Sequence, residues 1–402
     1  MKFAYLGIPH TGGTYTVYNS LRKGLGSCGI KIVWLGIGPK AQAALDNPQW
    51  SEEREHGVVV AGLINDDRMQ AQALIQYLEA SDFDGLFVNV LAGRVETNAI
   101  RYLSPSIKRV MIVHNITPGT YAAARAVRDH VHATIGVSPR IRDDLIKNHG
   151  FKESMTHAIP NAVDLNSFDV KRVERKLDVP LRVLFLGRVV DTDKGVFWLP
   201  KIMAKLSPKD AHLTVVGDGP DMEKLKLLCA NMSSQITFEG RITGQEVPDM
   251  LARHDVFIFP SRFEGLGMSL VEAMAQGCVP VASKIKGVTD FVITDGKDGL
   301  LFDIGDVAEA ANKIRSIAKD NEILKKMSVL ARQNIVERFD LKLMSHSYEK
   351  IIYKVINQEI NIAPTLRLRE WKYAEGLKSG FRSYLPKWMK NKLMIIREKI
   401  VK

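Results

Sequence analysis

The chain has 402 residues, of which 46% are hydrophobic and 25% are charged, and it carries a formal net charge of +11. Two domains of roughly 150–200 residues each are expected, because so long a chain exceeds one ordinary core. The three scattered cysteines exclude a disulfide framework and indicate a reducing compartment. The start, MKFAYLGIPH, lacks a signal-peptide apolar stretch, and no apolar run of about 18 residues follows, which predicts a cytoplasmic protein.

In the first half, short apolar runs alternate with helical patterns. A strand is predicted at 3–8, and a helix at 14–29 follows the Gly12-Gly13 turn. Further strands are predicted at 31–37, 85–90, 109–115 and 133–138. Fully apolar strands that alternate with helices are typical of a parallel sheet covered on both faces.

The pattern breaks at IPNAVDLNSF (159–168), and the charged stretch 171–180 is interpreted as a linker. The alternation then resumes, with strands predicted at 181–187, 212–217, 235–240, 255–261, 279–283 and 299–303. Residues 306–358 are predicted to be helical. This order predicts an α/β protein of two doubly wound domains, with the ligand site in a cleft beyond the carboxyl ends of the strands.

The stretch FEGLGMSLVEAMAQGCVPVAS (263–283), preceded by GRITGQEVPDMLARHDVFIFPS (240–261), resembles the signature of retaining glycosyltransferases of family four. The resemblance continues through LGRVVDTDKG, VVGDGP and DGKDGLLF, and weakly through TGGTYTVYNSLRKGLGSCG, VHN and IPNAVDLNSF. It implies the GT-B fold, in which two Rossmann-like domains face each other across a cleft, here with a C-terminal helical extension. It also implies transfer of a sugar from a nucleotide-diphosphate-sugar to a saccharide or lipid-linked hydroxyl acceptor, in polysaccharide or glycolipid assembly.

The implied domain boundaries follow from this resemblance. Residues 1–168 would form the acceptor-side domain, and 180–345 the nucleotide-sugar domain. Residues 346–362 would form a return helix, and 363–402 a basic amphipathic tail.

Two acids flank a glycine turn in the signature. The turn leaves room for close backbone approach and opens a helix whose free N–H groups suit an anion; its residues are Gly265, Leu266, Gly267 and Met268. The resemblance places Glu264 at the donor sugar and Glu272 at the ribose hydroxyls. The alternative is a solvated Glu264 and a surface salt bridge at Glu272.

Cations and a histidine complete the predicted donor site. Arg188 and Lys194 could neutralise a diphosphate and stabilise it as it leaves, which is the role that the resemblance assigns to them. The spacing between them is one residue longer than the commonest family form. His114 would contact the donor sugar; the alternative is a structural histidine. Arg241 would lie at the nucleobase.

Several motifs have a simpler interpretation. Gly12 and Gly13 could lie near a phosphate or form a plain tight turn. VVGDGP (215–220) lacks the third glycine of a dinucleotide fingerprint. The D-x-D patterns at 82–84 and 191–193 match metal-binding pairs of the other large glycosyltransferase fold. They are interpreted as incidental, because Arg188 and Lys194 already supply positive charge, and no metal is predicted.

The tail concentrates the positive charge, since residues 363–402 contain 11 Lys or Arg and three Glu. Basic residues beside Trp371, Phe381, Tyr384 and Trp388 favour an anionic membrane surface, at the inner face of the plasma membrane. Packing of a helix on the first domain is the alternative. A nucleic-acid patch is a third, which no other feature supports.

Two other functions remain open at this stage. A sugar-nucleotide epimerase on the same fold would need an acid/base pair at the sugar. A non-catalytic sugar-nucleotide-binding protein would be free to lose some of the motif residues.

Overall fold

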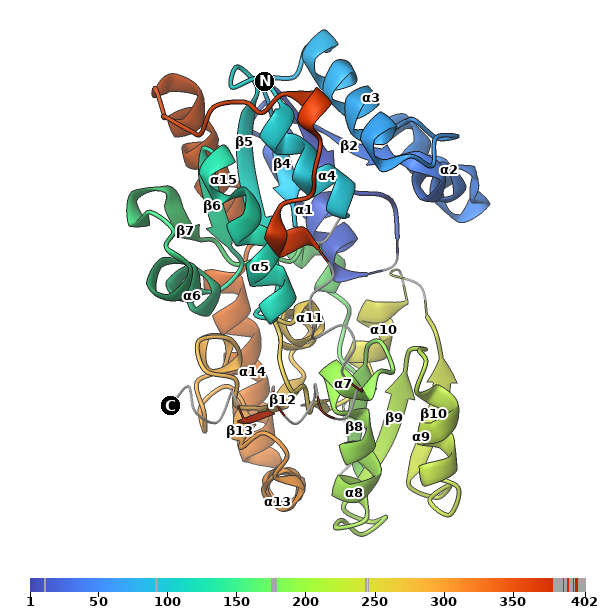
Figure 1. Cartoon of the computed structure of the whole chain (residues 1–402). Coiled ribbons are helices and arrows are strands. Elements are labelled where there is room, and N and C mark those ends of the chain that lie inside the picture. The colour runs from blue at the N-terminus through green and yellow to red at the C-terminus, as the bar shows by residue number, and fades with distance from the viewer. Residues whose placement is uncertain are drawn as a thin grey trace. The chain divides into compact units, whose positions relative to one another are not determined.

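The computed structural model describes residues 1–10, 12–90, 93–174, 179–242, 244 and 246–378, and the single positions 386, 389, 393, 395 and 396. The chain forms two compact units (Figure 1). Unit 1 comprises Met1–Ala162 and Leu341–Ser383, and unit 2 comprises Val163–Asp340 and Tyr384–Lys402. Residues 163–168, expected in the first domain, therefore belong to unit 2. Part of the expected linker, 175–178, lies outside the described residues.

Within the described residues, unit 1 contains a seven-stranded parallel sheet in the order β3-β2-β1-β4-β5-β6-β7. Its strands are β1 (Lys2–Leu6), β2 (Lys31–Ile37), β3 (Gly57–Val60), β4 (Gly85–Asn89), β5 (Lys108–Val113), β6 (Ala133–Gly136) and β7 (Thr156–Ala158). The described α-helices are α1 (Gly13–Gly26), α2 (Gly38–Asp46), α3 (Asp67–Ala80), α4 (Arg94–Ala99), α5 (Pro118–Val127), α6 (Pro139–His149) and α15 (Leu341–Asn357).

Helix α15 returns the chain to unit 1 and packs on α1. The approach is close, because a Cβ added to Gly24 would lie 1.9 Å from Ser345 Oγ. The return helix was predicted at 346–362. It begins earlier, at Leu341, directly after the short break at Phe339–Asp340, and it ends at Asn357.

The described part of unit 2 contains a six-stranded parallel sheet in the order β10-β9-β8-β11-β12-β13. Its strands are β8 (Leu181–Leu186), β9 (Ala211–Val216), β10 (Ile236–Gly240), β11 (Val256–Phe259), β12 (Val279–Ser283) and β13 (Leu300–Phe302). The described α-helices are α7 (Asp191–Lys194), α8 (Leu199–Met203), α9 (Met222–Leu228), α10 (Val247–Ala252), α11 (Met268–Ala275), α12 (Thr289–Val292), α13 (Val307–Ala318) and α14 (Asn321–Arg338). The strands bury their apolar side chains against α8, α9, α13 and α14 in one continuous core.

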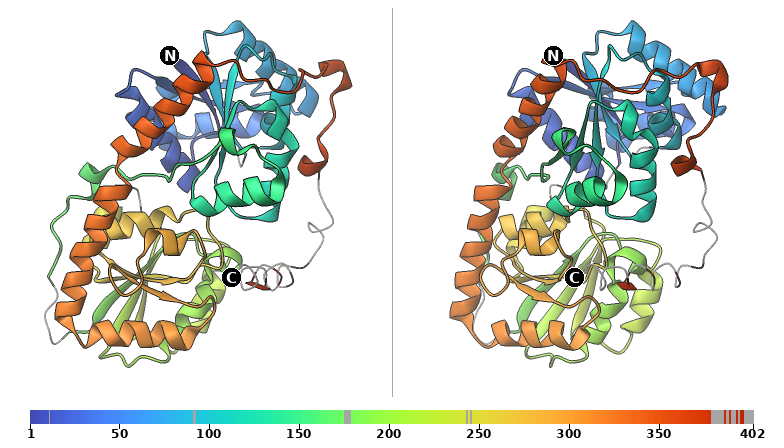
Figure 2. Two further views of the ribbon diagram at one scale, coloured as in Figure 1. Left: turned by 90° about the vertical axis from the view of Figure 1, so that its left-hand side faces the viewer. Right: turned by 60° about the vertical axis from the view of Figure 1, so that its left-hand side comes forward.

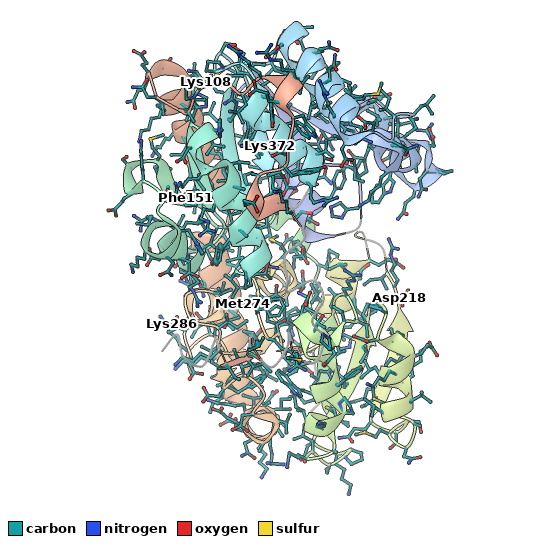
Figure 3. All side chains as sticks on the ribbon, in the orientation of Figure 1. Lys108, Phe151, Asp218, Met274, Lys286 and Lys372 are labelled. Atoms are coloured by element: carbon teal, nitrogen blue, oxygen red, sulfur yellow. The ribbon has the colours of Figure 1, made fainter. Side chains whose placement is uncertain are left out.

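The sequence between α15 and residue 378 forms a strap, defined here as residues 363–378, that lies on unit 1. Figure 2 shows it in red along the outside of the unit, and Figure 3 marks its Lys372. The Ala363 N–H donates to the Asp129 carbonyl at 2.6 Å, and the Leu366 N–H donates to the Arg101 carbonyl at 2.9 Å. At the far end, a Cβ added to Gly376 would lie 2.1 Å from the Ala122 carbonyl oxygen of α5.

One buried amide in α4 holds the middle of the strap. Asn98 is fully buried. Its Nδ2 donates to the Lys372 carbonyl at 3.1 Å, and its Oδ1 accepts the Ala374 N–H at 3.2 Å. The Trp371 ring lies 4.9 Å from the ring of Tyr102. Residues 363–378 therefore pack on unit 1, as in the alternative interpretation of the tail, and membrane binding by the tail stays a prediction. Phe381, Tyr384 and Trp388 lie outside the described residues.

None of the helices among the described residues is long and apolar enough to cross a membrane.

We expect Asn98→Ala to release the strap locally. The substitution leaves the Ala374 N–H without its partner, and a buried group that loses its partner costs about 1–3 kcal/mol. Hydrogen exchange at the strap amides should therefore accelerate by roughly tenfold or more. The matched control is Lys372→Ala, because the Lys372 side chain is exposed and only its backbone is bonded. Equal exchange in the two variants would show that Asn98 does not hold the strap.

Candidate functional site

The strand order of unit 2 reverses between β8 and β11, since β8 leads outward to β9 and β11 leads outward to β12. Ligands in doubly wound sheets bind beyond the carboxyl ends of the strands at such a point. The two loops that leave it are 187–190 after β8 and 260–267 after β11. They carry Arg188, Glu264 and the glycine turn.

The loop after β8 is held by the loop after β9. The Val189 N–H donates to the Asp218 carbonyl at 2.9 Å, and Figure 3 marks Asp218. A Cβ at Gly217 would lie 1.9 Å from the Gly187 carbonyl oxygen, and one at Gly219 would lie 2.3 Å from that of Val189. The glycines of VVGDGP therefore let two backbones meet, and they position Arg188. The Arg188 side chain is exposed and has no hydrogen bond or ion pair with another described residue.

Asp191, the first aspartate of the D-x-D pattern at 191–193, is hydrogen-bonded within the loops of this site. Asp191 Oδ2 accepts from Arg262 Nη2 at 2.7 Å, and its Oδ1 accepts the Phe197 N–H at 3.0 Å. The Arg262 guanidinium also lies 3.9 Å from the ring centroid of Trp198. In unit 1, Asp82 pairs with the Lys2 ammonium. Among the described residues, no cluster of three or more His, Cys, Asp or Glu could hold a metal ion.

Lys194 and Glu264 meet although they come from different loops. The Lys194 ammonium forms an ion pair with Glu264 Oε1, and the Ser261 hydroxyl donates to the same oxygen at 2.8 Å. Glu264 is only 8% exposed. The approach depends on Gly195, which has φ +62° and where a Cβ would lie 2.2 Å from the Pro260 carbonyl oxygen. The result is a buried carboxylate whose second oxygen stays free of these two contacts.

Helix α11 begins directly at the glycine turn. Gly267 has φ +89°, and a Cβ there would lie 2.9 Å from the Phe259 ring, so glycine suits both the backbone and the space. The N–H groups of Leu270 and Val271 bond to the Gly267 carbonyl. The N–H groups of Met268 and Ser269 have no acceptor within the helix, which leaves them at its positive end.

Glu272 lies one turn into α11 and is half-buried. Burial raises the pKa of its carboxyl group from 4.5 to about 7. Among the described residues, no side chain forms an ion pair with it. A carboxylate without a cation on a short helix is expensive to ionise, so a ligand that donates hydrogen bonds to it would be favoured.

Arg241 lies apart from these groups, directly after β10 at the sheet edge. Its side chain is exposed, and it borders a hollow of about 410 Å³ lined also by Gly217, Asp218, Met222 and Phe238.

In unit 1, His114 follows β5 and is 8% exposed. Burial lowers the pKa of its imidazole to about 4, so the ring is neutral at pH 7. Gly12 precedes α1, and Gly13 is the first residue of that helix. The Gly12 N–H donates to His10 Nδ1 at 2.8 Å, which uses one donor that a phosphate would need.

The structure therefore brings together Lys194, Glu264 and the glycine turn in unit 2, and it places His114, Gly12 and Gly13 in unit 1. Two residues that position the site were not predicted, Ser261 and Arg262. They follow β11 in the sequence FIFPSRFEG, and polar residues directly after a buried strand at the switch point were the available signal.

A family model matches part of unit 2. Residues 180–320 match the model of the family described as glycosyl transferases group 1. This segment belongs to that family. The family resemblance predicted from the sequence is thereby confirmed for this segment.

Two curated relatives match over part of their length. A sulfoquinovosyl transferase of Arabidopsis thaliana is 29% identical over 235 residues, which are 55% of this chain and 45% of that protein. The N-acetyl-alpha-D-glucosaminyl L-malate synthase of Bacillus anthracis is 31% identical over 154 residues, 38% of this chain and 40% of that protein. The chain thus spans less than half the length of each.

Solved structures show the fold. Anabaena HepE, in complex with UDP and glucose, has a TM-score of 0.74 at 17% identity and covers 88% of this chain and 100% of its own. Sucrose-phosphate synthase of Thermosynechococcus elongatus has a TM-score of 0.74 at 18% identity and covers 89% of this chain and 99% of its own. The fold is GT-B, as predicted.

The raised pKa of Glu272 predicts a pH-dependent cost to stability. The folded pKa of about 7 lies above the unfolded value of 4.5. The folded state therefore binds the proton more tightly, and stability falls as the pH rises from 4.5 to 7. We expect Glu272→Gln to be more stable than wild type by about 2 kcal/mol at pH 8 and by almost nothing at pH 4.5. Urea unfolding at both pH values measures this, and a difference that does not change with pH would contradict it.

Proposed function

We propose that the protein is a retaining glycosyltransferase that transfers a sugar from a nucleoside diphosphate to a hydroxyl acceptor during polysaccharide or glycolipid assembly. The observation that carries the proposal is the group formed by Lys194, Glu264 and Ser261 beside the free N-terminus of α11, within a group 1 glycosyl transferase segment.

The donor would lie along this group. The N–H groups of Met268 and Ser269 suit a diphosphate, and the exposed Arg188 suits its outer oxygens. Lys194 keeps two N–H donors besides the one directed at Glu264. These cations and dipoles would supply the positive charge that the leaving group needs, so the proposal includes no metal. Glu272 would accept hydrogen bonds from the ribose hydroxyls, and Arg241 would lie at the base.

The sugar would be held through Glu264, because its free oxygen can accept a hydroxyl hydrogen bond. In the reaction, the bond from C1 of the sugar to the phosphate oxygen breaks, and a bond from C1 to the acceptor oxygen forms on the same face. The acceptor proton passes to the leaving phosphate oxygen, so no protein nucleophile is proposed. His114 would contact the donor sugar as a neutral donor or acceptor.

A panel of UDP, GDP, ADP and CMP tests the donor site. A ligand that binds only the folded state stabilises it by about 2.7 kcal/mol at a hundredfold excess over Kd. We expect one nucleoside diphosphate to raise the melting midpoint of wild type by several degrees and to have much less effect on Glu272→Gln. UDP is the first choice, because the structural neighbour HepE was solved with it. No response to any nucleotide would contradict the donor site, both for the enzyme and for a non-catalytic sugar-nucleotide-binding protein.

Turnover of the identified donor then tests the chemistry. We expect Glu264→Gln to reduce transfer by about 10²–10³-fold while nucleotide binding persists. The exposed Glu322→Gln in α14 is the control and should leave transfer unchanged. Full activity of Glu264→Gln would contradict the assignment. Inversion of the sugar at C2, C3 or C4 in place of transfer would identify the epimerase.

We further propose that residues 379–402 bind an anionic membrane, which would bring the protein to a lipid-linked acceptor. This segment contains seven Lys or Arg and one Glu, interleaved with three aromatic residues. Polybasic segments gain about 1 kcal/mol per cation near an anionic surface. Because the strap packs on unit 1, residues 379–402 are the part of the basic tail that remains the candidate for membrane binding.

We expect a chain truncated after Lys378 to lose membrane binding and keep nucleotide binding. Cosedimentation with vesicles of phosphatidylcholine and 30% phosphatidylserine, at low salt and at 0.5 M salt, measures this. The full chain should sediment with these vesicles at low salt only, because salt screens the attraction. Equal sedimentation with pure phosphatidylcholine, or of the truncated chain, would contradict the proposal.

A further inference from the structure

Arg262 is a buried cation of unit 2 that the proposed reaction does not use. It is 7% exposed and follows β11, two residues before Glu264. Its Nη2 donates to Asp191 Oδ2 at 2.7 Å, and its Nε donates to the Asp191 carbonyl at 2.8 Å. Its backbone N–H donates to the Asp193 carbonyl at 2.7 Å. Replacing a buried ion pair by apolar side chains is often neutral or stabilising, so stability alone does not account for Arg262.

Asp191 and Lys194 are neighbours on the four-residue helix α7. They are three residues apart, a spacing at which opposite charges on a helix attract each other. Nevertheless, within the described part of the chain, the Lys194 ammonium pairs with Glu264 and the Asp191 carboxylate pairs with Arg262. Asp193 is adjacent to Lys194 in the sequence, and adjacent residues do not face each other on a helix. Asp191 is therefore the local competitor of Glu264 for the charge of Lys194.

The carboxylate of Asp191 is fully occupied by other groups. Its Oδ2 accepts from Arg262, and its Oδ1 accepts the Phe197 N–H at 3.0 Å. The Asp191 N–H donates to Asp221 Oδ2 at 2.7 Å, which fixes the start of α7. The ring of Trp198 lies 3.9 Å from the Arg262 guanidinium and supports it from one face. Both carboxylate oxygens thus have partners, and one of these partners is a cation held in place by an aromatic ring.

We propose that Arg262 is a positioning residue that determines which carboxylate Lys194 pairs with. By occupying Asp191, it leaves Glu264 as the partner of the lysine and holds the ammonium where the diphosphate would leave. Without the guanidinium, the Asp191 carboxylate attracts the Lys194 ammonium along α7. This inference rests on the proposed glycosyltransferase function, and it adds a residue that acts on the reaction through Lys194 without touching the substrate.

The alternative is that Arg262 only braces the loops after β8 and β11. Both roles predict that Arg262→Gln lowers activity, but they differ in the effect of a second substitution. If Arg262 is a brace, Asp191→Asn removes one more contact and cannot restore what was lost. If Arg262 selects the partner of Lys194, Asp191→Asn removes the competing charge and returns the lysine to Glu264.

Transfer of the identified donor separates these two roles. We expect Arg262→Gln to reduce kcat by about 10–100-fold, because the ammonium no longer lies where negative charge develops. The double variant Arg262→Gln/Asp191→Asn should recover at least about tenfold of that loss, a non-additive result typical of residues in one charge network. The control is Arg253→Gln, which alters an exposed arginine before β11 at the opposite edge of the sheet and should leave transfer unchanged.

Crystal structures of the same variants report the pairing without turnover. We expect Lys194 Nζ to contact Asp191 in Arg262→Gln and to contact Glu264 again in the double variant. Arg262→Lys keeps the positive charge and is the milder variant should Arg262→Gln fail to fold; in it, Lys194 should stay at Glu264.

Three results would overturn the inference. They are a lysine that stays at Glu264 in Arg262→Gln, a lysine that moves to Asp191 in Arg262→Lys, and a double variant no more active than the single one. If the wild type transfers no sugar, the proposed function fails, and the crystal structures still decide whether Arg262 selects the partner of Lys194.

Discussion

Close contact between backbones at the switch point of unit 2 is the constraint on which the proposed donor site depends. Lys194 and Glu264 are separated by 70 residues, and they meet only because Gly195 lets the end of α7 lie against the Pro260 carbonyl. Glycines 217 and 219 likewise allow the loop after β9 to lie against the backbone of the loop that carries Arg188. A side chain at Gly195 would separate Lys194 from Glu264, whose attraction weakens with distance, and a side chain at 217 or 219 would displace the loop of Arg188.

The electrostatics of this site follow from that contact. Lys194 compensates the buried charge of Glu264, and Arg262 compensates Asp191, so the framework is neutral before any ligand is considered. Arg188 and the first N–H groups of α11 add positive potential, whereas Glu272 is costly to ionise. A ligand that carries a diphosphate beside hydroxyl groups suits both the positive potential and the carboxylate. Its diphosphate would bind at the N-terminus of α11, and its hydroxyls would donate hydrogen bonds to Glu272. Neither a simple anion nor a neutral sugar does so alone.

Much of the fold was predictable because apolar strands leave a clear pattern, whereas contacts between distant loops do not. The strands 31–37 and 279–283 were predicted as they occur, and most others within two residues. β3 and β7 were missed because they are edge strands of four and three residues, too short to show a period. The helical region 306–358 is three helices, which break at Asp320 and Asp340. The glycine turn and both glutamates were predicted from their motif, but the ion pair of Glu264 with Lys194 depends on packing that local sequence does not encode.

Two buried asparagines of unit 1, Asn98 and Asn161, differ in whether their amide groups are hydrogen-bonded. Asn98 is buried with both ends of its amide bonded, and such a fully satisfied group fixes one chain path, here that of the strap. Asn161 is also buried, yet its carbonyl oxygen has no partner among the described residues. A buried oxygen of this kind is satisfied by ordered water or by a ligand, so Asn161 does not fix the path of the chain in the way that Asn98 does.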